Sequence, residues 1–503
     1  MSAVQRSILF SALERYGSVA IVFATMAVLS RLLSPAEFGV YAVISAILTV
    51  ISASYSEMGG ANYLIQKTGL CTVDVRTAFT VTSVLSVIIA LALVLIGDRI
   101  AAFYDQDGLG HGLAIAAISL LVLPFSATIT ALYRREMQFG TLALCNLTAN
   151  LVGSIAAIWL AMLHYSFMAP VWGVVISNFV LTVVLLAVRR DISIFRPSLS
   201  GAKDVMGFGL YSSGVSLINV FYNLAPQIFL ARILDFGAVG LYSRAIGITQ
   251  LFDRLIGQVL SPVVMPAIFR QLEAGGDLKR IYLDAIRLLS GVYWPALAVT
   301  AIMAEPIITI WLGSSWAEVI PLVRVICIAY FALFAACLTY PVLVAAGGIH
   351  DVLRCSLISL PPSLCLVFAA SFFGVTWVAA SMLITLPFQA AVAIGLIARR
   401  LGLGWIDLIG ALWKSALISL MTAVSALIFA ALIQLNVINM VPGLIAGTAC
   451  ATATWLAGML LTQHPLSDTI IAASSAILPG RLTRLWSARD AQDIQSAEHG
   501  QKL

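Results

Sequence analysis

Amide side chains recur at a spacing of four residues in two stretches of the sequence. One stretch carries three amides, and the other carries an arginine between two amides: Asn219, Asn223 and Gln227, then Gln250, Arg254 and Gln258. Residues four apart share one face of a helix, so each set predicts a polar stripe. Amides both donate and accept hydrogen bonds, and a guanidinium binds carboxylate or phosphate oxygens through paired N–H groups. The two stripes therefore suit a polar ligand that carries negative charge.

Charged residues also lie inside otherwise apolar runs. Glu14 is adjacent to Arg15, and Asp253 is adjacent to Arg254. Neighbouring side chains on a helix point about 100° apart, so neither pair neutralises itself face to face. Each charge requires a partner on another helix, water or an anionic ligand. We predict Arg15 and Arg254 as binding residues, and Glu14, Glu57 and Asp253 as coupling or ion-pair candidates.

The elements that position these residues are membrane-spanning helices. The 503 residues are 61% hydrophobic and only 10% charged, whereas roughly a quarter of the residues of soluble domains are charged. Apolar runs of about 20 residues, the length that crosses a bilayer core as a helix, recur from end to end. The fold class predicted is an all-α polytopic membrane protein. The seven cysteines show no metal-type spacing and are expected to be packing residues.

Hydropathy predicts fourteen spans. Their approximate ranges are 9–33, 37–64, 77–97, 112–133, 138–163, 167–188, 206–231, 238–265, 282–303, 318–345, 352–372, 374–398, 408–433 and 439–461. Lys and Arg gather in alternate connections, such as Arg134 with Arg135 and Arg399 with Arg400. The positive-inside rule then places these connections and both termini in the cytoplasm.

The chain contains an internal repeat. LSRLLSPAEFGVYAV (29–43) aligns without a gap on LARILDFGAVGLYSR (230–244), 201 residues further on. Six spans separate the copies, so the repeats are predicted to be parallel, related by an axis along the membrane normal. The four corner residues, Arg31, Gly39, Arg232 and Gly240, are interpreted as structural: a helix end whose arginine reaches the membrane interface, a turn, and a glycine.

The repeat predicts a domain organisation. Two six-helix lobes (1–188 and 205–400) are joined by a basic cytoplasmic linker (189–204). Two additional helices (401–463) and a cytoplasmic tail (464–503) follow. The simplest geometry places the first two spans of each lobe around a hydrophilic cavity between the lobes.

Three stretches carry a family resemblance: RYGSVAIVFATMAVLSRLLSPAEFGVYAV (15–43), EMGGANYLIQ (57–66) and LARILDFGAVGLYSRA (230–245). They resemble the oligosaccharide flippases of the multidrug/oligosaccharidyl-lipid/polysaccharide exporter superfamily, especially exopolysaccharide and O-antigen translocases. The resemblance implies a V-shaped, alternating-access carrier in the bacterial cytoplasmic membrane. Its cargo would be a polyprenyl-diphosphate-linked oligosaccharide, whose diphosphate Arg254 and Arg15 would hold. It implies no catalytic residues and no cofactor, and it allows a coupling cation (proton or sodium) and other polysaccharide assembly proteins as partners.

Two other readings stay open. A membrane glycosyltransferase or polysaccharide polymerase could use Asp105 and Asp107 to hold a divalent metal, although such pairs are common in turns and no outer loop is large. A multidrug/cation antiporter of the same superfamily would bind mostly cationic substrates, which a cavity with several arginines suits poorly. The five histidines are scattered singly, so we expect no metal site, and the net charge of +5 indicates no nucleic-acid partner.

Overall fold

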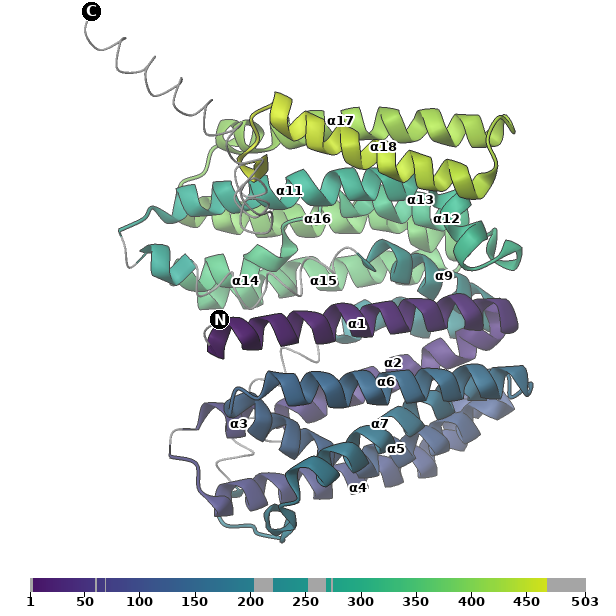
Figure 1. Ribbon diagram of the computed structural model, residues 1–503, viewed down its shortest axis with the longest axis vertical. Helices are drawn as coiled ribbons and strands as arrows, with labels where there is room; N and C mark the ends of the chain where they lie inside the picture. Colours follow the sequence, from purple (N-terminus) through teal and green to yellow (C-terminus); the bar gives the residue numbers. More distant parts are fainter. Residues whose placement is uncertain are drawn as a thin grey trace, which may run out of the picture.

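The computed structural model describes residues 3–58, 61–67, 69–202, 220–251, 268–272 and 275–467, and they form helices joined by short turns, with no strand among them (Figure 1). Eleven of the helices in these ranges are long and apolar enough to cross a membrane, so the protein is a multi-pass membrane protein. They are α1 (Ala3–Leu32), α2 (Pro35–Met58), α4 (Thr72–Tyr104), α5 (Asp107–Arg135), α6 (Phe139–Met162), α7 (Met168–Arg189), α11 (Leu278–Ile302), α15 (Ile349–Ser371), α16 (Val375–Leu401), α17 (Trp405–Gln434) and α18 (Met440–Leu461).

Shorter elements lie between these helices, and a helical segment over 268–272 is also described. They are α3 (Ala61–Gln66), η1 (Ile192–Phe195), a helical segment over 220–233, α9 (Phe236–Thr249), α12 (Ala304–Trp311), η3 (Ser314–Trp316), α13 (Val319–Tyr330) and α14 (Ala336–Ala345). The predicted span 318–345 is wrong as a single helix, because a turn over 331–335 separates α13 from α14. The predicted spans 206–231 and 238–265 lie partly outside the described residues, so a count of fourteen stays a prediction.

Apolar side chains on the outside of the bundle explain why these helices form in a membrane. On α4, Ala90 and Leu93 are buried, whereas Leu91 and Leu95 are 57% and 69% exposed. A helix that satisfies its backbone internally and is apolar on its outer face suits hydrocarbon. The fold therefore presents apolar side chains to lipid on its outer face as well as burying them between helices.

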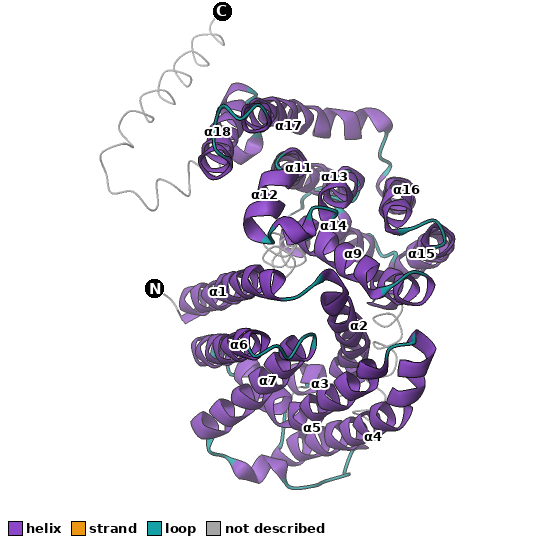
Figure 2. Cartoon of the chain, turned by 90° about the vertical axis from the view of Figure 1, so that its right-hand side faces the viewer, coloured by secondary structure: helices purple, strands orange, loops and turns teal. Residues whose placement is uncertain are grey.

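The helices form two groups (Figure 2). Helices α1 to α7 form the N-terminal half, and the elements from 220–233 to α16 form the C-terminal half. The halves meet most extensively where α2 packs on α9, while α17 and α18 pack on α11 at the outer side of the C-terminal half. We call the end of the bundle that contains the turns before α2 and α9 the corner end.

The two repeated glycines lie in a reciprocal contact at the corner end. A Cβ atom on Gly39 would lie 1.7 Å from the carbonyl oxygen of Phe236, and one on Gly240 would lie 1.9 Å from the carbonyl oxygen of Pro35. Phe236 is the repeat equivalent of Pro35, so each copy presents the same surface to the other. Such a self-complementary contact is typical of a two-fold axis. Only glycine permits this approach of two helix backbones.

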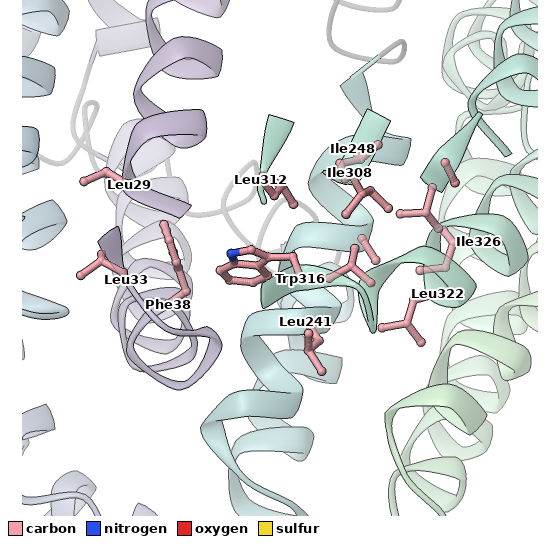
Figure 3. Packing of buried hydrophobic residues seen from close by; sticks show 14 of the residues in the cluster. Leu29, Leu33, Phe38, Leu241, Ile248, Ile308, Leu312, Trp316, Leu322 and Ile326 are labelled. Carbon is pink, nitrogen blue, oxygen red and sulfur yellow. The ribbon is translucent and has the colours of Figure 1, made fainter. Parts of the chain in front are cut away.

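Aromatic side chains extend this contact into a buried core (Figure 3). Trp316 and Phe38 are 0% and 1% exposed, and their rings meet edge to face with centroids 5.5 Å apart. The Trp316 indole N–H donates to the Ser30 carbonyl at 2.7 Å. Nearby, Trp311 stacks on Phe23 at 3.7 Å. Aromatic packing and buried hydrogen bonds thus join the halves at the corner end.

The two corner arginines also reach the opposite half. Arg31 donates to the Ile310 carbonyl oxygen at 2.7 Å, and the Arg232 guanidinium lies over the Phe103 ring, 5.2 Å from its centroid. Both arginines are exposed. Their predicted structural role stays a prediction, and the sequence did not indicate these contacts between the halves.

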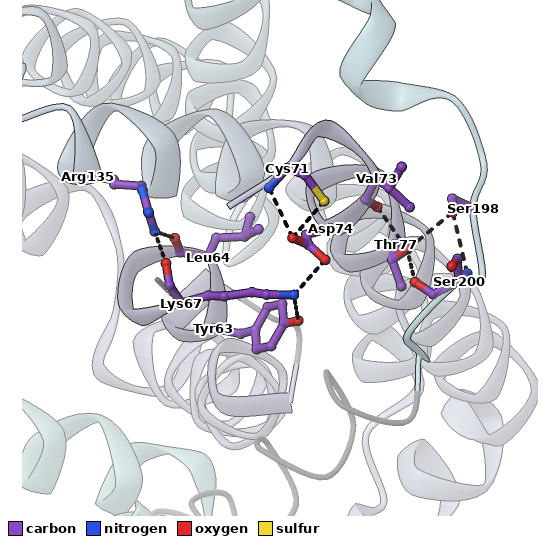
Figure 4. Close-up of polar contacts among 10 residues, drawn as sticks. All are labelled: Tyr63, Leu64, Lys67, Cys71, Val73, Asp74, Thr77, Arg135, Ser198 and Ser200. Carbon is purple, nitrogen blue, oxygen red and sulfur yellow. Dashed lines mark hydrogen bonds and ion pairs between the residues drawn. The ribbon is translucent and has the colours of Figure 1, made fainter. Parts of the chain in front are cut away.

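At the other end of the N-terminal half, polar contacts tie the connections to the helices (Figure 4). Lys67 pairs with Asp74 at 2.7 Å, and Arg135 donates to the Lys67 carbonyl at 2.7 Å. The described part of the predicted linker packs along α4, where the Thr77 hydroxyl donates to the Ser200 carbonyl at 2.7 Å. This segment is therefore attached to the N-terminal half as far as residue 202.

Candidate binding site in the N-terminal half

Several predicted site residues lie outside the described residues. Asn219, Asp253, Arg254 and Gln258 belong to this group. Glu57 lies on α2, but its side chain is also outside the described part. The predicted pairing of Arg254 with Arg15 thus stays a prediction.

The described residues of the two amide stripes lie in the C-terminal half. Gln250 caps the end of α9 and donates to the Tyr330 hydroxyl at 2.8 Å. Gln227 is half-buried and Asn223 exposed on the segment 220–233. The Gln250 amide N–H is therefore occupied within its own half, which leaves its carbonyl oxygen for other contacts.

Glu14 and Arg15 lie on α1, and both are half-buried. The Glu14 carboxylate accepts a hydrogen bond from the Asn146 amide on α6. One turn further along both helices, the Asn150 amide donates to the Ser18 hydroxyl at 3.0 Å. These bonds form a polar ladder between α1 and α6, which supplies Glu14 with a neutral partner inside the N-terminal half.

A cavity of about 160 Å³ lies between α1, α2, α6 and α7. Its polar lining comes from four helices of the N-terminal half and one residue of α9: Thr25, Tyr41, Asn150, Ser154, Ser177 and Arg244. The Ser154 and Ser177 hydroxyls have no hydrogen-bond partner in the described part of the chain. The cavity therefore offers neutral donors and acceptors together with one guanidinium.

Arg244 is the residue that sequence reasoning missed. Its place near a helix end predicts an exposed side chain, yet it is 7% exposed. Its guanidinium covers the Phe38 ring at 3.7 Å and lies 5.8 Å from the Trp316 ring. It forms no hydrogen bond or ion pair with any described residue, and its Nε is buried without a partner. The internal repeat could have indicated this residue. Arg244 aligns with Val43, so only the second copy of the repeat carries a charge at this position.

A second cavity, of about 280 Å³, continues from the first and shares Tyr41 and Val174 with it. Its polar lining comes from the serine and threonine stripe of α2 and from two neighbouring helices: Ser45, Thr49, Ser52, Ser119 and Asn178. Hydroxyl and amide groups without charges suit a neutral, polyhydroxylated ligand. The walls of both cavities are mostly apolar, and these polar groups are interspersed along them. We call the two cavities together the polar tract, with Arg244 at the corner end.

Comparison with known proteins identifies the family. A profile described as polysaccharide biosynthesis protein matches residues 28–321. The chain belongs to this family. The match covers both copies of the internal repeat, and the family resemblance predicted from the sequence is confirmed.

Two named relatives have comparable identity. The succinoglycan biosynthesis transport protein ExoT of Rhizobium meliloti (strain 1021) is 22% identical over 510 residues, which cover 95% of this chain and 96% of ExoT. The lipopolysaccharide biosynthesis protein WzxC of Escherichia coli (strain K12) is 23% identical over 310 residues, 60% of this chain. The match spans 62% of WzxC, less than two thirds of its length.

The architecture matches a solved structure. The lipid II flippase MurJ, in an inward closed conformation, superposes with a TM-score of 0.72 at 13% identity. The match covers 92% of this chain and 100% of MurJ. The family member described here thus shares the MurJ fold, and the predicted all-α polytopic class is confirmed.

Proposed function

We propose that the protein is a flippase that translocates polyprenyl-diphosphate-linked oligosaccharides across the bacterial cytoplasmic membrane, for exopolysaccharide or O-antigen-type synthesis. The family assignment, a relative named as a transport protein and the MurJ fold support this proposal. The structural observation that most directly supports the proposal is the polar tract inside the N-terminal half. It places hydroxyls, amides and one guanidinium within an apolar bundle. Polar groups at membrane depth mark a substrate path.

The arrangement of the halves fits alternating access. The cross-half hydrogen bonds that involve Arg31 and Trp316, and the reciprocal glycine contact, all lie at the corner end. Closing one end while the halves rock about the site is the usual mechanism of such repeats. The sugar units would pass along the polar tract while the lipid tail stays in the bilayer.

The proposed orientation places the corner end outward and both termini in the cytoplasm. Basic residues lie at the opposite end of the N-terminal half, including Lys67, Arg135 and Arg189. Lys and Arg are enriched in cytoplasmic connections. In this orientation the conformation described here is closed to the outside.

The diphosphate and the energy source complete the proposal. Arg254, supported by Arg15, holds the diphosphate through paired guanidinium N–H groups. Glu14 is the candidate for coupling to a proton or sodium ion, because its carboxylate has only a neutral amide partner in the described part of the chain. Other polysaccharide assembly proteins are expected partners.

Deletion of the gene, followed by leaflet-resolved analysis of lipid-linked sugars, tests the function. A flippase deletion leaves complete repeat units stranded on the cytoplasmic leaflet. Truncated units would instead indicate a glycosyltransferase, and complete units on the outer leaflet a polymerase. Either of these results contradicts the proposal.

A further inference from the structure

Arg244 has a charge that nothing in the described part of the chain balances. It is 7% exposed, and every interaction of its guanidinium with a described side chain is with an aromatic group. An uncompensated buried charge is costly, and an anionic ligand in the cavity would balance it. Phe38 covers one face of the guanidinium, and the N–H donors lie in the guanidinium plane. Arg244 is one of the residues that line the 160 Å³ cavity.

The cavity limits the size of its ligand. A protein cavity of about 150 Å³ holds one benzene ring, so a cavity of about 160 Å³ admits one six-membered ring. Tyr41 supplies an aromatic surface, and the unpartnered hydroxyls of Ser154 and Ser177 supply hydrogen-bonding groups. A single sugar ring matches this combination of size and lining.

The charge of the cavity limits its ligand as well. Arg244 is the one charged residue among the described residues that line it. A diphosphate carries more than one negative charge and would require further cations in a site that holds little water. A carboxylate carries one charge and accepts the paired N–H groups of a guanidinium. The lining therefore favours a monoanion.

We propose that this cavity binds one acidic sugar residue, a uronate, and that Arg244 pairs with its carboxylate. This inference rests on the proposed function and specifies its substrate class: an oligosaccharide that contains a uronic acid. The acidic residue would occupy the corner end of the polar tract, and neutral residues would follow along the α2 hydroxyls Ser45 and Thr49.

The full-length protein, purified in lipid nanodiscs, allows a direct test. Thermal unfolding, followed by tryptophan fluorescence, is measured with glucuronate, glucose, the methyl ester of glucuronate, inorganic phosphate and pyrophosphate. We expect glucuronate alone to raise the unfolding temperature in a concentration-dependent manner, because the ester and glucose share the ring without the charge. Equal stabilisation by phosphate or pyrophosphate would show a general anion site and overturn the proposal.

Variants assign the effect to Arg244. Arg244→Gln should raise the half-saturating glucuronate concentration at least tenfold. Arg244→Lys should raise it less, because lysine keeps the charge and lacks only the planar guanidinium with its paired N–H groups. Ser177→Val removes a hydroxyl from the cavity wall and leaves the charge of Arg244 in place, so it should also weaken the stabilisation by glucuronate. The control is Arg324→Gln, whose wild-type arginine is exposed and pairs with Glu305 at 3.7 Å; its response should equal that of the wild type.

The uronate-site proposal and the flippase proposal can be contradicted independently of each other. An unchanged glucuronate response in both Arg244→Gln and Ser177→Val contradicts the uronate site, whatever the deletion strain accumulates. If Arg244→Gln does not purify as a folded protein, Ser177→Val and Arg244→Lys decide the question by themselves. A deletion strain without stranded lipid-linked units contradicts the flippase function instead, and the sugar-binding measurement does not depend on it.

Discussion

Trp316 of the C-terminal half donates its indole N–H to the backbone carbonyl of Ser30 in the N-terminal half, at 2.7 Å. The bond is buried and joins a turn that follows α12 to the last turn of α1. A carrier that opens at the corner end must break it. The bond therefore contributes to the free-energy difference between the closed and open corner.

Trp316→Phe keeps the ring against Phe38 and removes the donor. A buried hydrogen bond contributes about 1 kcal/mol, so we expect the open-corner population to rise about fivefold. Labelling of Leu29→Cys by an impermeant maleimide, in a background without native cysteines, measures this population, because Leu29 is 4% exposed. Trp455→Phe is the matched control, since its indole on α18 donates to the Gly291 carbonyl on α11, away from the contact between the halves. Equal labelling of both variants would contradict the gate assignment.

Gly39→Ala and Gly240→Ala should each separate α2 from α9. The added Cβ would lie 1.7 or 1.9 Å from a carbonyl oxygen that belongs to backbone, which has little freedom to move. We expect a loss of stability of about 1–3 kcal/mol or more and loss of export, measured by thermal unfolding and by complementation of the deletion strain. Gly247→Ala, with nothing within 4 Å of the new Cβ, is the control and should be tolerated.

Arg254→Ala should impair export strongly while its level in the membrane stays near normal, and Arg254→Lys should impair export partly. Both predictions follow from a diphosphate held by a planar guanidinium. Export complementation and immunoblotting of membranes measure the two quantities. If Arg254→Glu combined with Glu14→Arg or Glu57→Arg restores export, Arg254 is an ion-pair partner and the substrate assignment is wrong.

Buried His464, just beyond α18, predicts a pH dependence. Its ring nitrogen lies 3.2 Å from the Ser415 hydroxyl, and burial, then Lys414 and Arg287, lower the pKa of the imidazole below 6.5. The native state therefore favours neutral His464, so the stabilisation is complete above pH 6.5 and falls as the pH drops through the lowered pKa. The hydrogen-exchange protection factors of the Gln463, His464, Leu466 and Ser467 amides, which are corrected for the intrinsic pH dependence of exchange, should be lower at pH 5.5 than at pH 7.5. His464→Gln should reduce this difference, and an unchanged difference would exclude the imidazole as its cause.

The sequence predicted the features that follow from hydropathy and repetition. Long apolar helices and the equivalence of Gly39 with Gly240 need only periodicity and an alignment of the chain with itself. The break between α13 and α14 was missed because apolar residues continue through the turn at 331–335. Hydropathy measures the length of an apolar run and carries no information on whether the run bends.

The candidate site was harder to predict. The sequence predicted binding groups on Arg15, on the stripe from Asn219 to Gln227 and on the stripe from Gln250 to Gln258, and these assignments stay predictions. The described polar tract lies mainly on α1, α2, α6 and α7. Helical spacing shows that residues share a face but does not show which helix that face meets. The burial of Arg244 depends on a contact between the halves, because Phe38, just over two hundred positions earlier in the sequence, covers its guanidinium.

The reciprocal glycine contact also has a genetic consequence. In a symmetric dimer of identical chains, one codon specifies both sides of a two-fold contact, so every substitution appears twice. Here each side has its own codon. The glycines are the same in both copies, while Pro35 corresponds to Phe236 and Val43 to Arg244. Fusion of the two copies into one gene thus permits a charge on one side of the axis alone, which a symmetric dimer cannot have.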